Sequence, residues 1–312
     1  MTRVIRSKRK TGDRKIMRRH HYVPQFYLRN WVGGKNNKLF IYYKDRNGNV
    51  RERYQSPKST AYGKDLYILK KERIFSSVIE PDQIEKQFFQ KLDNAASNVL
   101  KKILTAGIDF LRYEDKELWA YFILSLLERN IQRINSVDKF TIKSLDQIGN
   151  ELLASCRDKE SAANVERVIE LFKDEDAAHN IVQNNMLRLI NDPDFVTGLL
   201  NMSWKIIYIE SYELSFITTD YPVLINYGKD NEPIQWIAMP LSPNNLFVIY
   251  PSSWEWTDEF VKLICFGFNL RMIENCSKYV YARHPLKDGQ YHKYTKILHD
   301  LLPAYKVEAE YG

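Results

Sequence analysis

The apolar positions in the middle of the chain recur with the period of an α-helix. From 81 to 104 they fall three or four residues apart, and Pro81 stands in the first turn of the predicted helix. The segment 114–133 is apolar on most sides, which is typical of a central helix. Further helices are predicted at 137–156, at 161–173 with Ser161 as its cap, at 176–190 and at 194–202. We therefore expect a helical lobe over about 80–203.

On both sides of this lobe the pattern changes to the period of two that indicates β-strands. The segment 38–54 predicts a hairpin whose turn is Asn47-Gly48, and 65–69 is a candidate short strand. After the lobe, five short strands separated by turn residues favour an antiparallel sheet, at 204–210, 214–218, 223–226, 234–239 and 246–250. A last helix is predicted from a cap at Thr257 to about Ala282.

These elements predict an α+β fold, in which the helical middle packs on a mainly antiparallel sheet that the N-terminal hairpin could join. Residues 1–19 are expected to be a basic flexible arm, and 20–312 a single domain. Within that domain the sheet-rich part covers about 204–250 plus 38–70, and the C-terminal helix covers about 257–282.

The charge of the 312-residue chain changes the picture, because the net charge of +7 lies almost entirely in the arm. Residues 1–19 hold nine basic residues and one acid, so the remaining body is nearly neutral. Such an arm predicts contact with a polyanion, most simply nucleic acid. The expected contact residues are Arg9, Lys10, Arg14, Lys15, Arg18 and Arg19. The alternative is a solvated tail that aids solubility.

The three cysteines, Cys156, Cys265 and Cys276, form no CxxC pair. They are expected to be inert core thiols, with the last two on one buried face, which indicates a reducing compartment. The sequence shows no signal peptide and no apolar run of the ~20 residues that a membrane span needs. We expect a cytoplasmic protein with no membrane partner, and the sequence leaves its oligomeric state open.

The segment HHYVPQFYLRNW (20–31) directly follows the arm and carries the first candidate chemistry. Pro24 favours a short helix over 24–31, and His21, Gln25 and Arg29 are spaced four apart along it. An imidazole, an amide and a guanidinium on one edge suit proton transfer, a hydrogen bond to substrate and a phosphate clamp. The alternative is a histidine bonded to backbone and an arginine in a surface ion pair.

A second candidate lies where the predicted strand at 214–218 ends in Thr219 and Asp220. Asp220 could orient a histidine or hold a divalent metal, which is the only cofactor the sequence suggests. The alternative is an Asx-turn, in which the carboxylate caps its own turn. No Walker loop, GxGxxG or GxSxG motif is present.

Several segments together resemble the DUF4238 family of mostly microbial proteins, over about 20–283. They are HHYVPQFYLRNW, LFIYYKDRNG, a helix with Arg129 near its end, FITTDYPVLIN, MPLSPNNLFVIYP and FNLRMIENCSKYVYAR. The family typically reads FITSDNPV, so Thr219 and Tyr221 replace its Ser and Asn here. The resemblance implies one candidate site of His21, Tyr22, Gln25, Arg129, Asp220 and Asn269, and it implies no particular reaction.

The first hypothesis is a nucleic-acid-acting hydrolase with nuclease-like phosphodiester chemistry, in a host-defence or toxin-like role. His21 would be general base or acid, Asp220 its orienting partner or a metal ligand, and Arg129 and Arg29 the phosphate clamps. Thr219 would contribute its hydroxyl to substrate binding.

Two alternatives stay open. A non-catalytic nucleic-acid-binding protein would use the arm for affinity and stack bases on Tyr22, Tyr27 and Trp31. A structural or protein-interaction module would use the same segments only to join the hairpin to the sheet. It predicts that His21→Ala and Asp220→Ala lower the free energy of unfolding by about 1 kcal/mol or more.

Overall fold

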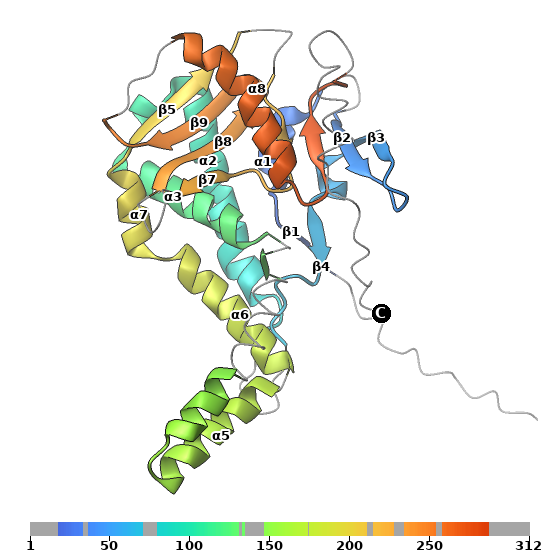
Figure 1. The fold of residues 1–312 in the computed structure, drawn as a ribbon. Helices are drawn as coiled ribbons and strands as arrows, with labels where there is room; N and C mark the ends of the chain where they lie inside the picture. Colours follow the sequence, from blue (N-terminus) through green and yellow to red (C-terminus); the bar gives the residue numbers. More distant parts are fainter. Residues whose placement is uncertain are drawn as a thin grey trace, which may run out of the picture.

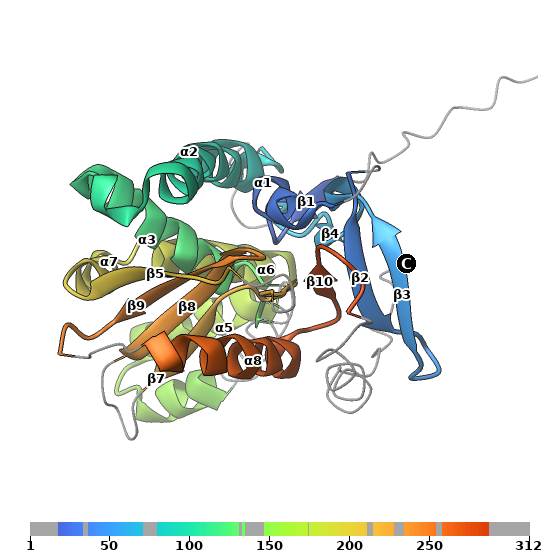
Figure 2. The same cartoon turned by 90° about the horizontal axis from the view of Figure 1, so that it is seen from above.

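A four-stranded antiparallel sheet lies at the centre of the fold, and helices cover both of its faces (Figures 1 and 2). The computed structural model describes residues 18–33, 37–70, 80–130, 133–134, 147–173, 175–210, 215–227, 234–253 and 258–286. The strands of the sheet are, in order, β5 (Ser203–Tyr208), β9 (Asn245–Tyr250), β8 (Ile234–Ser242) and β7 (Leu224–Tyr227). Helices α2 (Gln90–Ala106) and α3 (Tyr113–Glu128) cover one face, and α8 (Asp258–Asn275) covers the other.

Burial on both faces explains why the two central strands are apolar at nearly every position. Met239 and Phe247 belong to the hydrophobic core shared with α2 and α3, whereas Ala238 and Val248 belong to the core shared with α8. Successive side chains of a strand point to opposite faces, so each strand supplies both cores in turn. Cys265 and Cys276 lie together in the second core, as predicted.

The N-terminal hairpin belongs to a second four-stranded sheet, separate from the central one. Its strands β2 (Leu39–Lys44) and β3 (Val50–Gln55) pair in antiparallel register around Gly48, whose φ of 78° suits the turn. The sheet continues through β10 (Val280–Ala282) to β6 (Thr218–Thr219). The hairpin therefore joins residues from the C-terminal part of the chain, but not the central sheet.

This second sheet corrects two predictions made from the sequence. The last helix ends at Asn275 rather than near Ala282, because 280–282 pair with β2 on one side and β6 on the other. Residues 215–217 are not a strand, and β6 is only two residues long. In both places long-range backbone pairing outweighs local propensity, which a single sequence does not reveal. Thr257, the expected cap, lies outside the described residues.

A two-stranded ribbon connects the arm to the body. Strand β1 (Arg19–His21) pairs with β4 (Tyr62–Lys64), so the predicted strand at 65–69 was wrong. Asp65 has a φ of 51°, which ends the extended backbone there. After β1 come α1 (Gln25–Leu28) and the 3₁₀ turn η1 (Arg29–Trp31), close to the predicted helix at 24–31, while η2 (Pro57–Ser59) precedes β4.

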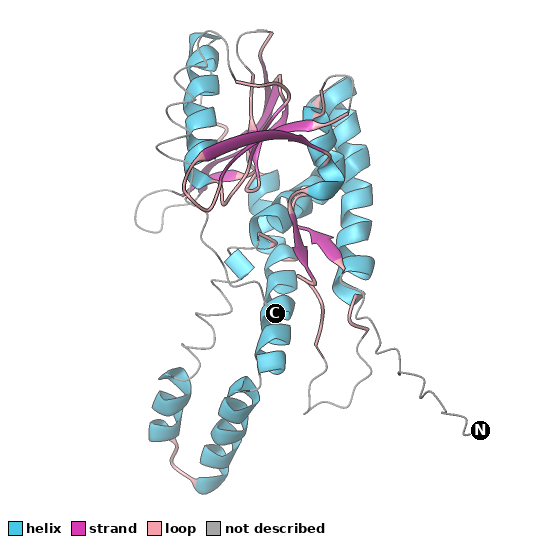
Figure 3. Cartoon of the chain, turned by 90° about the vertical axis from the view of Figure 1, so that its right-hand side faces the viewer, coloured by secondary structure: helices cyan, strands magenta, loops and turns pink. Residues whose placement is uncertain are grey.

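The helical lobe follows its predicted order. A π-helical segment, η3 (Ile84–Phe89), opens α2, and α5 (Lys159–Lys173), α6 (Glu175–Ile190) and α7 (Pro193–Leu200) follow α3. The helix at 147–155 and α5 project from the body as a hairpin (Figure 3). The start of the predicted helix at 137–156 lies outside the described residues. Ser161 is not the cap of α5, because the Asp158 carboxylate accepts from its backbone and hydroxyl.

The arrangement is the α+β fold predicted from the sequence, with antiparallel pairing throughout the strands that the structure describes. No helix among the described residues has the length and apolar character needed to cross a membrane.

Candidate functional site

The two segments that carry the candidate chemistry pack against each other through buried side chains. The Tyr27 hydroxyl lies 2.8 Å from Thr218 Oγ1 and donates to the Pro240 carbonyl at 2.5 Å. The Trp31 indole donates to the Phe216 carbonyl at 3.3 Å. Tyr22, Tyr27 and Trp31 are all buried, so the prediction that they stack on bases is wrong.

Asp220 holds the turn that directly follows α8. Its carboxylate accepts hydrogen bonds from the backbone N–H groups of Ser277 at 2.8 Å and Tyr279 at 3.2 Å. Its carbonyl accepts from the Asn130 side chain, which ties it to the end of α3. Burial raises the pKa of Asp220 to about 7, although these backbone donors act in the opposite direction. The bonds differ from the expected Asx-turn, because they reach a turn that lies 57 and 59 residues further along the chain.

The expected partnership of Asp220 with His21 is not present. Among the described residues no hydrogen bond or ion pair joins the two side chains, and Asp220 is not one of the groups that shift the pKa of His21. Those residues also contain no group of three or more His, Cys, Asp or Glu side chains placed to hold a metal ion. Because both carboxylate oxygens accept backbone bonds, the geometry gives Asp220 a positioning role.

Thr219 and Asn269 have similar structural roles beside it. Thr219 Oγ1 donates to the Tyr221 carbonyl at 2.8 Å and accepts from the Tyr221 N–H at 3.1 Å. The Asn269 side chain accepts from Ile217 N at 3.1 Å and donates to the Ser215 carbonyl at 2.9 Å. Both residues are buried, and Asn269 fixes the chain that enters β6 while Thr219 fixes the chain that leaves it.

Arg129 caps the C-terminus of α3 and is fully buried. Its Nη2 bonds Asp93 Oδ1 at 2.9 Å, and its guanidinium carbon lies over the rings of Phe89 and Phe122 at 5.1 and 5.7 Å. Nε and Nη1 are buried with no hydrogen-bond partner in the described part of the chain. A buried guanidinium with two unused donors is uncommon, because such donors normally find a partner.

Two acids that sequence reasoning missed accompany Arg129. Glu85 stands in the π-helical segment, and its Oε2 is buried with no partner among the described residues. Burial raises the pKa of Glu85 to about 7, with Arg129 acting in the opposite direction. Burial also raises the pKa of Asp93, again against Arg129. In the sequence, the signal for these two acids was their spacing of eight residues beside the apolar face of one predicted helix. The π-helical segment is a structural signal, because such segments often occur at functional sites.

The two neighbouring histidines have different environments. His20 is buried and stacked on Tyr67, and its Nδ1 accepts from the Tyr67 N–H at 2.9 Å. His21 stands beside it on β1, and its Nε2 has no hydrogen-bond partner within the described ranges. Burial lowers the pKa of His21, and the charge of Arg129 acts in the same direction, against a backbone hydrogen bond with Lys58. His21 is therefore neutral at pH 7 and can accept a proton.

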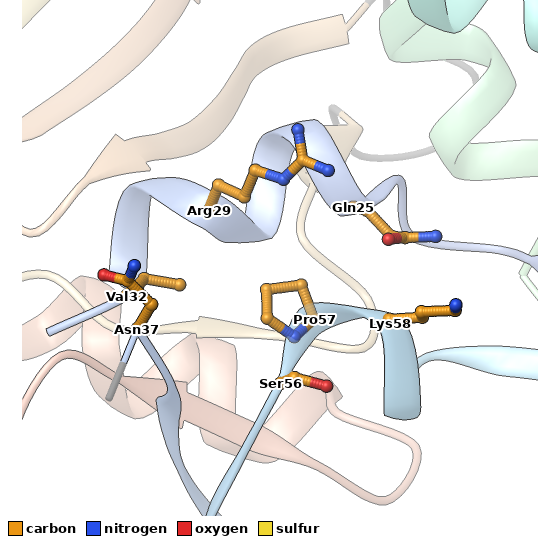
Figure 4. Close-up of a pocket in the computed structure, with 7 residues that line it drawn as sticks. All are labelled: Gln25, Arg29, Val32, Asn37, Ser56, Pro57 and Lys58. Atoms are coloured by element: carbon orange, nitrogen blue, oxygen red, sulfur yellow. The ribbon is translucent and has the colours of Figure 1, made fainter.

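Figure 4 shows a pocket of about 490 Å³ at Lys58, the residue whose backbone hydrogen-bonds this histidine. It is lined by Gln25, Arg29, Val32, Asn37, Ser56, Pro57 and Lys58. Gln25 and Arg29 share the pocket as their spacing predicts, while His21 lies just before α1 and adjoins Lys58. Lys58 was not predicted, because only the tertiary contact of η2 with α1 brings it there. Arg129, Asp220, Thr219 and Asn269 do not line it.

The basic arm is described only at its end. The Arg18 side chain pairs with Asp82 at 2.8 Å, and its backbone N–H bonds Asp65 at 2.9 Å. The guanidinium of Arg19, an exposed residue, lies 4.8 Å from the centroid of the Tyr62 ring. The other expected contacts, Arg9, Lys10, Arg14 and Lys15, lie outside the described residues. Both described arginines thus belong to the folded body.

Comparison with known proteins agrees with the resemblance noted from the motifs. The family model described as "Protein of unknown function (DUF4238)" matches residues 19–285, which is most of the chain. No curated protein and no solved structure matches it. The match spans β1, both sheets, the helical lobe and α8. On this evidence the chain belongs to the DUF4238 family.

Proposed function

We propose that this protein is a nucleic-acid-acting hydrolase that cleaves phosphodiester bonds beside the pocket of Figure 4. The observation that carries the proposal is the position of His21. Its imidazole hydrogen-bonds the backbone of Lys58, which lines the pocket together with Arg29, and its Nε2 is buried without a partner among the described residues. Such chemistry would suit a host-defence or toxin-like role.

In this proposal His21 is the general base. Protection from solvent keeps the imidazole neutral at pH 7, and the neutral form accepts a proton from an attacking hydroxyl or water. Arg29 and Lys58 bind the phosphate and offset the charge that develops on it in the transition state. Arg129, predicted as a clamp, contributes through its charge behind His21, because its side chain is fully buried.

The test is cleavage of RNA and DNA, single-stranded and duplex, by the wild type and by His21→Ala. Removing a general base typically costs about 10²–10⁴-fold in rate, so we expect cleavage to fall by that factor. His179→Ala is the matched control, because His179 is also half-buried, bonds the Ile68 carbonyl and does not line the pocket. Unchanged cleavage by His21→Ala, with both variants folded by their melting curves, would reject the catalytic role.

A second candidate is nucleic-acid binding without turnover. It is favoured by one observation: Asp220 bonds backbone N–H groups, and no carboxylate in the described residues hydrogen-bonds His21. General bases are commonly oriented by such a third group. This candidate predicts binding to the same substrates with no cleavage by the wild type at any pH or with any added divalent metal.

A further inference from the structure

The pocket of Figure 4 combines two basic side chains that no acid in the described part of the chain neutralises, Arg29 and Lys58, with apolar walls. Arg29 and Lys58 are both exposed, and neither has a carboxylate partner among the described residues. Other basic residues, including Arg51, Lys102 and Arg133, are paired with acids. None of the described residues that line the pocket is an acid. Its ligand is therefore expected to carry negative charge.

The shape and chemistry of the other walls narrow the ligand further. Val32 and Pro57 are apolar, Gln25 and Asn37 carry amides, and Ser56 carries a hydroxyl. Side-chain amides offer both donors and acceptors, as the edges of nucleobases do. Inorganic phosphate would leave the apolar walls and the amides unused. A volume of about 490 Å³ falls within the range of roughly 300–1,000 Å³ typical of small-ligand sites.

We propose that this pocket holds one unpaired nucleotide of a single-stranded nucleic acid, with the phosphate between Arg29 and Lys58 and the base against Val32 and Pro57. The inference rests on the proposed function, because both take nucleic acid as the ligand. The planar guanidinium of Arg29 can bind a phosphate with two parallel hydrogen bonds, whereas Lys58 acts as a point charge. A base enters such a pocket only when it is free of its pairing partner, so single strands bind in preference to duplexes.

The location supports a strand rather than a free nucleotide. Arg19 stands on β1, two residues before His21, and its guanidinium is stacked on Tyr62 of the paired strand. The residues that precede it are the basic arm. A strand that leaves the pocket along β1 would therefore meet Arg19 as a further cation.

The experiment measures binding of short fluorescent single strands, RNA and DNA, and of the matching duplexes, by anisotropy. His21→Ala protein is used so that cleavage does not interfere. We expect single strands to bind about tenfold or more tightly than duplexes, and Arg29→Ala and Lys58→Ala each to weaken that binding by about tenfold. The control Arg53→Ala removes an exposed arginine on β3 that does not line the pocket, and it should change affinity less than about twofold.

Competition separates a nucleotide site from a general anion site. A nucleoside monophosphate should displace the single strand at a concentration at which inorganic phosphate does not. Equal competition by phosphate, equal affinity for duplex, or equal effects of Arg29→Ala and Arg53→Ala would each overturn the inference. If the single strand binds as expected but the wild type does not cleave it, the hydrolase proposal fails and the inference stands. If the wild type cleaves nucleic acid and His21→Ala does not, but duplexes bind as tightly as single strands, the inference fails and the hydrolase proposal stands.

Discussion

At the scale of single residues, burial decides which of the chemically capable side chains can act on a ligand. Arg129 was predicted to clamp a phosphate and Asp220 to orient His21 or hold a metal, and both are almost fully enclosed by the protein. Asp220 uses its carboxylate to hold the turn at Ser277–Tyr279, and Arg129 uses one nitrogen on Asp93. Arg29 differs from them because it is exposed and forms no ion pair among the described residues, whereas His21 is half-buried and bonds the Lys58 backbone.

Glu85 gives a prediction for pH at this scale. Because its pKa is raised from 4.5 to about 7, the folded state binds its proton more tightly than the unfolded chain does. Its contribution to stability is therefore present in full below pH 4.5 and is lost as the pH rises toward 7. The groups that act on it are Arg129, Asp93, Asp82 and Gln90. We expect Glu85→Gln to be more stable than the wild type at pH 8, by about 2 kcal/mol, and to lose this advantage at pH 4.

Urea denaturation at a series of pH values measures this difference. Glu166→Gln, an exposed position on α5, is the control and should follow the wild type within about 0.5 kcal/mol. The histidines His20 and His21 have lowered pKa values and act with the opposite sign, but they are common to both proteins and cancel in the comparison. A Glu85→Gln difference that does not vary with pH would contradict the raised pKa.

At the scale of elements, the ion pair of Arg129 with Asp93 joins the end of α3 to α2. Tyr67 adds to this connection, because its hydroxyl donates to the Arg129 carbonyl at 3.0 Å. This packing explains why the sequence pattern predicted the helices but not the side-chain contacts that hold them together. The apolar faces of α2 and α3 were readable from their period, whereas Asp93, the acid that pairs with Arg129, lies beside the apolar face of α2.

We expect this pair to be strongly coupled. Arg129→Met should lower the free energy of unfolding by about 3 kcal/mol, because it leaves the half-buried Asp93 carboxylate without its partner. The double variant Arg129→Met with Asp93→Leu should cost less than the two single variants added together, as a double-mutant cycle by urea denaturation would measure. Additive effects would show that the two side chains do not depend on each other in solution.

At the scale of the whole molecule, the basic arm leads directly into β1 and α1, and α1 supplies Gln25 to the pocket. The structure shows where the folded part begins, because Arg18 pairs with Asp82 and Arg19 opens β1. A deletion that tests the arm should therefore remove residues 1–17 and keep both arginines. Deleting them along with the arm would also disturb the β1–β4 ribbon that carries His21.

Removing residues 1–17 should reduce the salt dependence of nucleic-acid binding. The deletion removes seven of the basic residues and one acid, so fewer phosphates are neutralised. Log Kd rises with log salt with a slope of roughly 0.7–0.9 per neutralised phosphate, so the slope should fall by several units. Anisotropy titrations from low to high salt measure it, and the melting temperature should stay unchanged. An equal slope of log Kd against log salt in the full and truncated chains would show that residues 1–17 do not bind the phosphates.

The sequence by itself determined what local pattern can determine. The hairpin at Asn47-Gly48, the order of the helices and the α+β class follow from periodicity and turn chemistry, which act over a few residues. The spacing of Gln25 and Arg29 also placed both side chains at one pocket. These features depend on neighbours in the chain, and for that reason they could be read from it.

Only the tertiary structure decided which residues meet. It paired β10 with β2 and β6, and it brought Lys58 to the pocket. It also buried Tyr27 and Trp31, and it placed the Asp220 carboxylate on the turn after α8, where it does not bond His21. Each of these outcomes depends on burial and on partners many tens of residues away. The free energy of removing a charge or a ring from water is set by the folded surroundings, and those surroundings are absent from any local stretch of sequence.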